Sequence, residues 1–171
     1  LGGEAELMAR ATEYIAPMSG RTIVAGAASM GIAAKICNNM MLFIDLMASA
    51  EGSQLAEKLG LDPKVFWEIA SVSSGRSWAQ QTWYPVPDII DTAAANKNFE
   101  ATFRTDLARK DVGLALDAGQ STGVRLPAAT LAKEHFDELI AQGLGDRDCS
   151  LIVKNLLPDE KVRGWDPEQA S

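Results

Sequence analysis

Lys35 has the surroundings in this sequence that most favour chemistry. Between Thr22 and Ala50 the only charged residues are Lys35 and Asp45. Lys35 falls about a turn and a half into a predicted helix, where the positive end of the helix dipole and the apolar neighbours both disfavour a cation. A lysine in this position can exchange a proton with a hydroxyl group, or bind a carboxylate beside the free N–H groups of the helix start. The alternative is that Lys35 extends to solvent and has no function.

Asn39 follows Lys35 by four residues, so it lies one turn further along the same helix face, where its amide could orient the same ligand. Spacing alone leaves open that Asn38 and Asn39 belong to an exposed polar strip. The two cysteines, Cys37 and Cys149, have no metal-ligand spacing, so we expect reduced thiols and no metal site.

Two further groups of candidates lie downstream. Arg76 and Trp78 follow a glycine in a predicted break between helices, where side chains can reach a cleft, although Trp78 could equally be a packing residue. Lys110 and Asp111 belong to the run "RTDLARKD", which in isolation also fits a solvated charged face. His135, the only histidine, is expected at the surface or in packing.

The elements that position these residues are mainly α-helical. Residues 4–16 predict a short amphipathic helix, and 21–26 ("RTIVAG") predict a short buried strand, together the edge of an α/β sheet. One strand cannot form a sheet, so its neighbours are expected elsewhere. A long apolar helix from Ser29 or Met30 to Leu59 then forms the centre of a helical bundle.

Residues typical of helix ends mark the limits of the other predicted helices in the bundle. Asp62 is expected to cap a helix that begins at Pro63, and Gly119 to end a helix from about residue 104. Helical patterns at 126–143 and 147–157 complete the bundle, with a long connection over 79–102. The predicted division is residues 1–28 as an α/β segment, 29–160 as an all-helical domain, and 161–171 as a loose tail.

The composition excludes some function classes. A net charge of −7 without a clustered basic face argues against a nucleic-acid partner. No secretory signal is visible, and Lys35, Asn38, Asn39 and Asp45 interrupt the longest apolar stretch, so no membrane partner is expected. The predicted location is the cytoplasm, or the mitochondrial matrix in a eukaryote.

The string "GAASMGIAAKICNN", with Gly26, Gly31, Lys35 and Asn39, resembles the signature G-x-x-G-x-G-x-x-x-K-x-x-x-N of the β-hydroxyacid dehydrogenase family. The string "KDVGLALD", from Lys110, resembles the same family's K-D-L-G-x-A-x-D segment. "SSGRSW" and "YPVP" point to its 3-hydroxyisobutyrate dehydrogenase branch. The resemblance extends over most of residues 1–160. It implies that residues 1–28 are the C-terminal remnant of a dinucleotide-binding Rossmann domain and that residues 29–160 are the catalytic and dimerisation domain.

The resemblance implies oxidation of a β-hydroxy acid, 3-hydroxyisobutyrate, to its semialdehyde with NAD, although NADP is not excluded. It implies that Lys35 is the catalytic acid/base group. It further implies substrate binding by Asn39, Gly31 and Trp78, and cofactor binding by Lys110, Phe103 and Asp111. A related semialdehyde reductase, or a non-catalytic dimerisation module formed by the isolated chain, are the alternatives.

The sequence departs from the family pattern in two places. Ser29 stands where the signature has its middle glycine, a change that a helix-capping serine could tolerate. The family's dinucleotide-binding G-x-G-x-x-G is absent from the 171 residues, so the chain is expected to need an N-terminal Rossmann domain and to be inactive alone. A homodimer or tetramer is expected.

Overall fold

Helix α2, Met30–Lys58, is the central element of the computed structural model, which describes residues 1–157 and 161–170. It begins and ends close to the predicted limits. Its end follows from Gly60, whose φ of +85° is one that residues with a Cβ rarely adopt, and whose N–H donates to the carbonyl of Glu57 at 3.0 Å. By length and composition alone α2 could cross a membrane, so the expectation of no membrane partner stays a prediction.

The chain divides into two compact units, Leu1–Asn39 and Met40–Ser171, and the division falls inside α2. The domain boundary predicted at residue 28 stays a prediction. The boundary predicted at residue 160 lies outside the described residues. The first unit contains α1, Ala5–Ile15, a 3₁₀ turn η1, Ala16–Met18, and the start of α2. The predicted first helix is therefore confirmed.

The predicted strand at residues 21–26 is extended chain, and the part of the chain that the structure describes forms no named strand. Its hydrogen bonds go to the first three residues: Leu1 N donates to Ile23 O at 2.9 Å, and Ala25 N donates to Leu1 O at 2.6 Å. Pairing between two segments of only a few residues does not form a stable sheet. The mainly α fold class is confirmed, with this extended segment in place of the strand.

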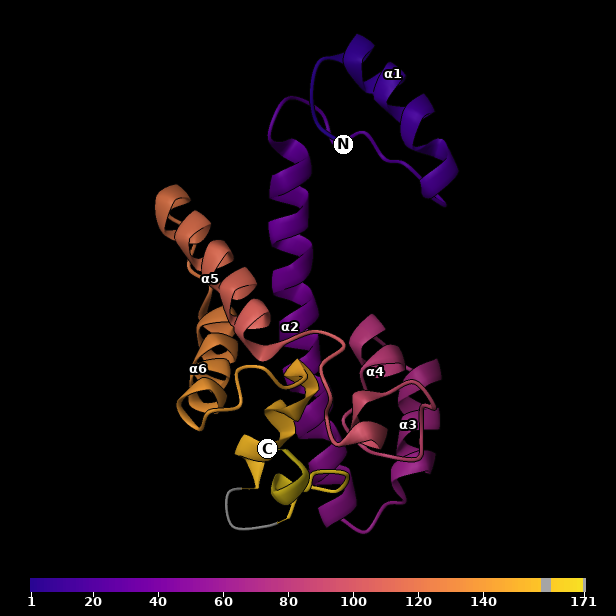
Figure 1. Cartoon of the computed structure of the whole chain (residues 1–171), viewed down its shortest axis with the longest axis vertical. Helices are drawn as coiled ribbons and strands as arrows, with labels where there is room; N and C mark the ends of the chain where they lie inside the picture. Colours follow the sequence, from indigo (N-terminus) through magenta and orange to yellow (C-terminus); the bar gives the residue numbers. More distant parts are fainter. Residues whose placement is uncertain (158–160, 171) are drawn as a thin grey trace. The chain divides into compact units, whose positions relative to one another are not determined.

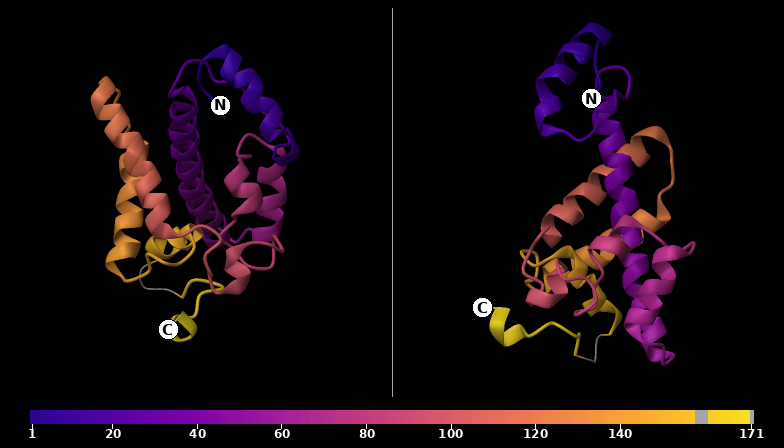
Figure 2. Two further views of the ribbon diagram at one scale, coloured as in Figure 1. Left: turned by 45° about the horizontal axis from the view of Figure 1, so that its top comes forward. Right: turned by 90° about the vertical axis from the view of Figure 1, so that its right-hand side faces the viewer.

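In the second unit, helices gather on the Met40–Lys58 part of α2 (Figures 1 and 2). The helices α5 and α6 run side by side, and α3 and α4 lie next to each other on a different side of α2. The elements are α3, Pro63–Val72; α4, Trp78–Thr82; η2, Ala94–Lys97; α5, Thr105–Thr122; α6, Pro127–Ala141; η3, Cys149–Leu156; and η4, Pro167–Ala170.

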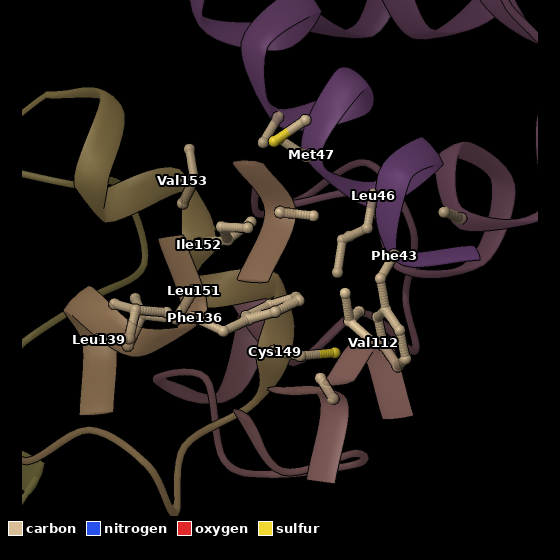
Figure 3. Close-up of a cluster of buried hydrophobic side chains, with 14 of the residues drawn as sticks. Phe43, Leu46, Met47, Val112, Phe136, Leu139, Cys149, Leu151, Ile152 and Val153 are labelled. Carbon is tan, nitrogen blue, oxygen red and sulfur yellow. The ribbon is translucent and has the colours of Figure 1, made fainter. Parts of the chain in front are cut away.

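The core of this unit lies where α2, α5, α6 and η3 meet (Figure 3). Every element contributes residues that are almost fully buried, which places the apolar face of each helix against the others. The side chains that Figure 3 labels are Phe43, Leu46, Met47, Val112, Phe136, Leu139, Cys149, Leu151, Ile152 and Val153.

Two sequence-based helix limits have different outcomes. Asp62 caps α3 as predicted, since its Oδ1 accepts hydrogen bonds from the backbone N–H groups of Lys64 at 2.9 Å and Val65 at 3.0 Å. Gly119 does not end α5; it is buried inside the helix, where a Cβ would come within 2.8 Å of Leu126. The helix ends at Gly123, whose φ is +75°.

The segment 161–170, predicted to be loose, makes specific contacts. Val162 belongs to the core cluster, and Trp165 packs against that cluster. Asn98 and the backbone of Asp166 exchange two hydrogen bonds, of 2.9 Å and 2.6 Å. Two apolar side chains and one amide are enough to order a short segment that composition alone marks as polar.

Candidate functional site

The start of α2 is built on unusual backbone angles. Gly26 has φ +112°, and Ser29 has φ +71°, in the left-handed region that favours glycine. The carbonyl of Ser29 accepts the hydrogen bond of Ala33 N at 3.0 Å, so Ser29 directly precedes the helix. An N-cap serine normally has extended backbone, so this serine does not occupy the usual cap geometry that the sequence suggested. The backbone angle explains why a glycine suits this position.

Gly31 has a packing role in the first unit. A Cβ on Gly31 would lie 3.3 Å from Gly2 N and from Leu1 C, and a Cβ on Gly2 would lie 2.8 Å from Gly31 N. The first residues of the chain therefore pass directly over the first turn of α2. A Cβ on Gly2 would require a backbone shift, whereas a Cβ on Gly31 would make a tight contact. The assignment of Gly31 to substrate binding stays a prediction.

Lys35 and Asn39 lie in the first three turns of α2, four residues apart. Lys35 is exposed and Asn39 is half-buried, with the Oδ1 of Asn39 accepting a hydrogen bond from Asn38 Nδ2 at 3.3 Å. The apolar surroundings predicted for this half of the helix are not supplied by the chain, since Ile32 is 62% exposed. Lys35 is thus open to a ligand or to another domain.

An aromatic cluster connects two of the predicted site residues in the second unit. Trp78, at the first position of α4, is 56% exposed and meets Trp83 edge-to-face at 5.1 Å between ring centroids. Trp83 lies 5.8 Å from Phe103, and Phe103 lies 5.7 Å from the fully buried Phe43. The cluster leads from the surface into the core, which fixes the half-buried rings of Trp83 and Phe103.

Phe103 is held by the buried carboxylate of Asp148. One oxygen, Oδ2, accepts hydrogen bonds from Phe103 N at 3.1 Å, Thr102 N at 2.8 Å and Thr102 Oγ1 at 2.7 Å. The other oxygen, Oδ1, accepts from Ser150 N at 3.0 Å and Ser150 Oγ at 2.6 Å. The carbonyl of Phe103 accepts from Cys149 N at 2.9 Å. Both backbone groups of Phe103 are therefore bound to residues at the start of η3, Asp148 and Cys149.

Lys110 and Asp111 form an ion pair on α5. The Nζ of Lys110 is 2.8 Å from Asp111 Oδ1, and the Lys110 side chain is 56% exposed whereas the Asp111 side chain is 8% exposed. The buried carboxylate of Asp111 therefore restrains the position of the Lys110 ammonium group. This arrangement leaves the ammonium face of Lys110 accessible to an anion.

The structure brings some predicted residues together and leaves others in separate units. Trp78 and Phe103 meet through Trp83, and Lys110 meets Asp111. Sequence reasoning missed Trp83 and Asp148. For Trp83 the signal was the five-residue spacing from Trp78 across a helix of one turn, whereas nothing local connects Asp148 with Phe103, 45 residues earlier.

The chemistry of these residues suits a nicotinamide dinucleotide. An exposed ammonium group can pair with a phosphate or a carboxamide oxygen, and partly exposed aromatic rings can pack against a planar ring. Among residues 1–157 and 161–170, no group of three or more His, Cys, Asp or Glu side chains is arranged to hold a metal ion.

Comparisons with known families and proteins match nearly the whole chain. The family model described as "NAD-binding of NADP-dependent 3-hydroxyisobutyrate dehydrogenase" matches residues 29–156. The human mitochondrial 3-hydroxyisobutyrate dehydrogenase is 37% identical over 160 residues, covering 94% of this chain and 48% of the relative. A probable 3-hydroxyisobutyrate dehydrogenase of Mycobacterium bovis is 38% identical over 156 residues, covering 91% and 53%.

A solved structure has the same fold. The Mycobacterium tuberculosis 3-hydroxyisobutyrate dehydrogenase with L-serine superposes with a TM-score of 0.85 at 39% identity, covering 91% of this chain and 53% of that one. The chain thus spans about half the length of the curated relatives it matches.

Proposed function

The chain belongs to the 3-hydroxyisobutyrate dehydrogenase family, and from that premise we propose that it forms the helical part of an enzyme that oxidises a β-hydroxy acid with NAD. The substrate that the motifs favour is 3-hydroxyisobutyrate, with methylmalonate semialdehyde as product. The proposal does not distinguish NAD from NADP, since the ribose 2′ position is read in a Rossmann βαβ unit and these 171 residues contain no G-x-G-x-x-G motif of such a unit.

We assign the acid/base role to Lys35. The Nζ of Lys35, when neutral, takes the proton of the substrate hydroxyl, and in the reverse reaction returns it to the carbonyl oxygen. A bound nicotinamide supplies the acceptor for the hydride that leaves the substrate carbon. The amide of Asn39, one turn along the same face of α2, holds the substrate in place for that proton transfer.

The remaining site residues orient the cofactor and shield the reacting atoms from water. Lys110, with its Nζ restrained by Asp111, provides a positive charge on the cofactor side. Trp78 and Phe103, joined by Trp83, provide an apolar surface that excludes water from the reacting atoms. Gly31 lets backbone approach closely at the start of α2.

The proposal also includes partners and location. A Rossmann domain would correspond to the half of the relatives that the chain does not match, and the enzyme would be a homodimer or tetramer in the cytoplasm or the mitochondrial matrix. A related semialdehyde reductase would use the same residues. A chain that only dimerises, without binding NAD, is the non-catalytic alternative; sedimentation combined with NAD titration by calorimetry separates the two.

The single observation that supports the catalytic proposal is that Lys35 and Asn39 occupy one face of the first turns of α2 within the region that the family model matches. The test is Lys35→Ala in the enzyme with its nucleotide-binding domain, with Lys64→Ala on the exposed side of α3 as control. Turnover should fall by about 10²- to 10⁴-fold for Lys35→Ala and stay unchanged for the control. Retention of more than about a tenth of the turnover would remove Lys35 from this role.

A further inference from the structure

A cavity of about 480 Å³ lies within the second unit, between the later turns of α2, helix α3 and the segment 73–77 that leads into α4. None of the four proposed site residues of this unit, Trp78, Phe103, Lys110 and Asp111, lines it. Its volume falls in the range of small-molecule sites. The cavity is therefore a different place from the aromatic cluster and the Lys110–Asp111 pair.

One part of the cavity wall is apolar. Phe66 and Ile69 from α3 line the cavity together with Ala48 and Gly52 from α2, and the Phe66 ring lies in van der Waals range of Gly52, 3.5 Å from where a Cβ would stand. Ile69 is 51% exposed, although it lines a concave surface. An aliphatic or aromatic group of a ligand would bury this surface.

The cavity also carries two opposite charges that do not pair with each other. Asp45 of α2 and Arg76 of the 73–77 segment both line it, and neither side chain has a hydrogen bond or ion pair with any residue that the structure describes. Asp45 is half-buried, and its burial raises the pKa of its carboxyl group. Arg76 is exposed. A half-buried carboxylate without a counter-charge is unfavourable, so a cation near Asp45 would be stabilising.

Two buried polar atoms in the wall have no partner within the described ranges: Gln80 Oε1 and Tyr84 Oη. Gln80 and Tyr84 are only 2% and 1% exposed. The orientation of the Gln80 amide is fixed, because its Nε2 donates to Trp67 O at 3.1 Å and to Ser71 Oγ at 3.0 Å. Its oxygen is therefore directed as an acceptor without a donor, which is rare for a buried group.

We propose that this cavity binds an α-amino acid with an apolar side chain. The ligand ammonium group supplies N–H donors to Asp45 and to Gln80 Oε1, the ligand carboxylate pairs with Arg76, and the side chain covers Phe66 and Ile69. A carboxylic acid without the ammonium group would leave Asp45 without a counter-charge and would be repelled by it. An amine without the carboxylate would leave Arg76 unpaired. Only a zwitterion satisfies both charges.

The proposal is tested first with the unaltered protein by calorimetric titration. L-leucine is the probe, and its two matched controls are 3-methylbutylamine, which lacks the carboxylate, and 4-methylpentanoate, which lacks the ammonium group. L-serine, which keeps both charged groups but lacks an apolar side chain, tests the contribution of the apolar wall to the affinity for L-leucine. L-leucine should bind, and each control should bind about ten- to a hundredfold more weakly, the loss expected for one charge-assisted contact. Absence of L-leucine binding at millimolar concentration, or equal binding of the controls, overturns the proposal.

Substitutions then locate the site. Asp45→Asn keeps side-chain size and Arg76→Gln keeps a polar, unbranched side chain, and each removes one charge, so each should weaken L-leucine binding by at least about tenfold. Glu68→Gln, on α3 but outside the cavity lining, is the matched control and should leave the affinity unchanged. Wild-type affinity in both cavity variants would place the ligand elsewhere and overturn the assignment. Should a variant fail to fold by circular dichroism, the comparison of ligands on the unaltered protein remains decisive.

Discussion

The buried carboxylate of Asp148 lies 3.1 Å from the backbone nitrogen of Phe103 and accepts its hydrogen bond. The two residues are 45 positions apart in the chain, and Asp148 is fully buried without an ion pair among the described residues. Its charge is compensated by five N–H and O–H donors, from Thr102, Phe103 and Ser150. A carboxylate with this many donors serves as a rigid connection between the start of α5 and the start of η3.

Asp148→Asn tests that connection. Asparagine keeps one acceptor oxygen and replaces the other by an NH₂ group, which would face donors instead of accepting from them. The free energy of unfolding should fall by about 2–4 kcal/mol, measured by urea denaturation. Asp146→Asn, an exposed neighbour, is the control and should change stability by less than about 0.5 kcal/mol. Equal stability of the two variants would show that the connection is unimportant.

The pairing of α5 with α6 should depend on acidity through Asp137. Partial burial raises the pKa of the Asp137 carboxyl group, but hydrogen bonds from Lys133 Nζ (2.5 Å) and Arg109 Nε (2.8 Å) outweigh burial and hold the pKa below its usual value. A folded-state pKa below the unfolded value means that the stabilisation is complete above the unfolded pKa of about 3.9 and is lost as pH falls through the folded pKa.

Asp137→Asn should therefore lower the free energy of unfolding near neutral pH and have little effect in acid. The Asp137 side chain is 41% exposed, so solvent screening limits the effect to about 1 kcal/mol or less. Urea denaturation of wild type and variant at about pH 7 and about pH 2, where the carboxyl group approaches full protonation in both states, measures the difference. Glu134→Gln on the same helix is the control. A difference that persists unchanged in acid would contradict this explanation.

The ordered conformation of the segment 161–170 should depend on Gly164. Its φ is +77°, and a Cβ there would clash with the carbonyl oxygen of Ala95. Gly164→Ala should lower the free energy of unfolding by about 2 kcal/mol or more and expose Trp165, which fluorescence quenching would report. Gly113→Ala in α5 is the matched control: nothing lies within 4 Å of its Cβ position, so it should stabilise by up to about 1 kcal/mol. Equal effects would refute the role of the Ala95 contact.

Ser29 should be a strained position that glycine relieves. At φ +71° the strain of a residue with a Cβ is about 1–2 kcal/mol, and glycine removes it at a smaller entropic cost. Amide exchange at Ala33, whose N–H donates to Ser29 O, should be slower in Ser29→Gly than in wild type and faster in Ser29→Val, whose β-branched side chain fits this backbone worst. The reverse order would rule out strain at this residue.

The sequence by itself determined the main helices and the family. Asp62 before Pro63, Gly60 after Leu59 and the apolar spacing of α2 are local signals, and local signals decide where a helix starts and stops. The placement of Lys35 and Asn39 one turn apart follows from helix geometry alone. The expected end of α5 at Gly119 was wrong because a glycine can serve close packing as well as termination, and only the position of Leu126 distinguishes the two.

Only the tertiary structure decided which distant residues meet. The carboxylate of Asp148 under Phe103, the contact of Trp83 with Phe103, and the shared cavity of Asp45 and Arg76 all join segments far apart in the chain. The segment 21–26 is a case in which the local pattern was not sufficient. Its β-branched residues favour a strand, but a strand forms only beside a neighbouring strand. The burial of a side chain, its pairing partner and the compensation of its charge all depend on how the helices pack against one another. The periodicity of the sequence therefore does not identify the residues concerned.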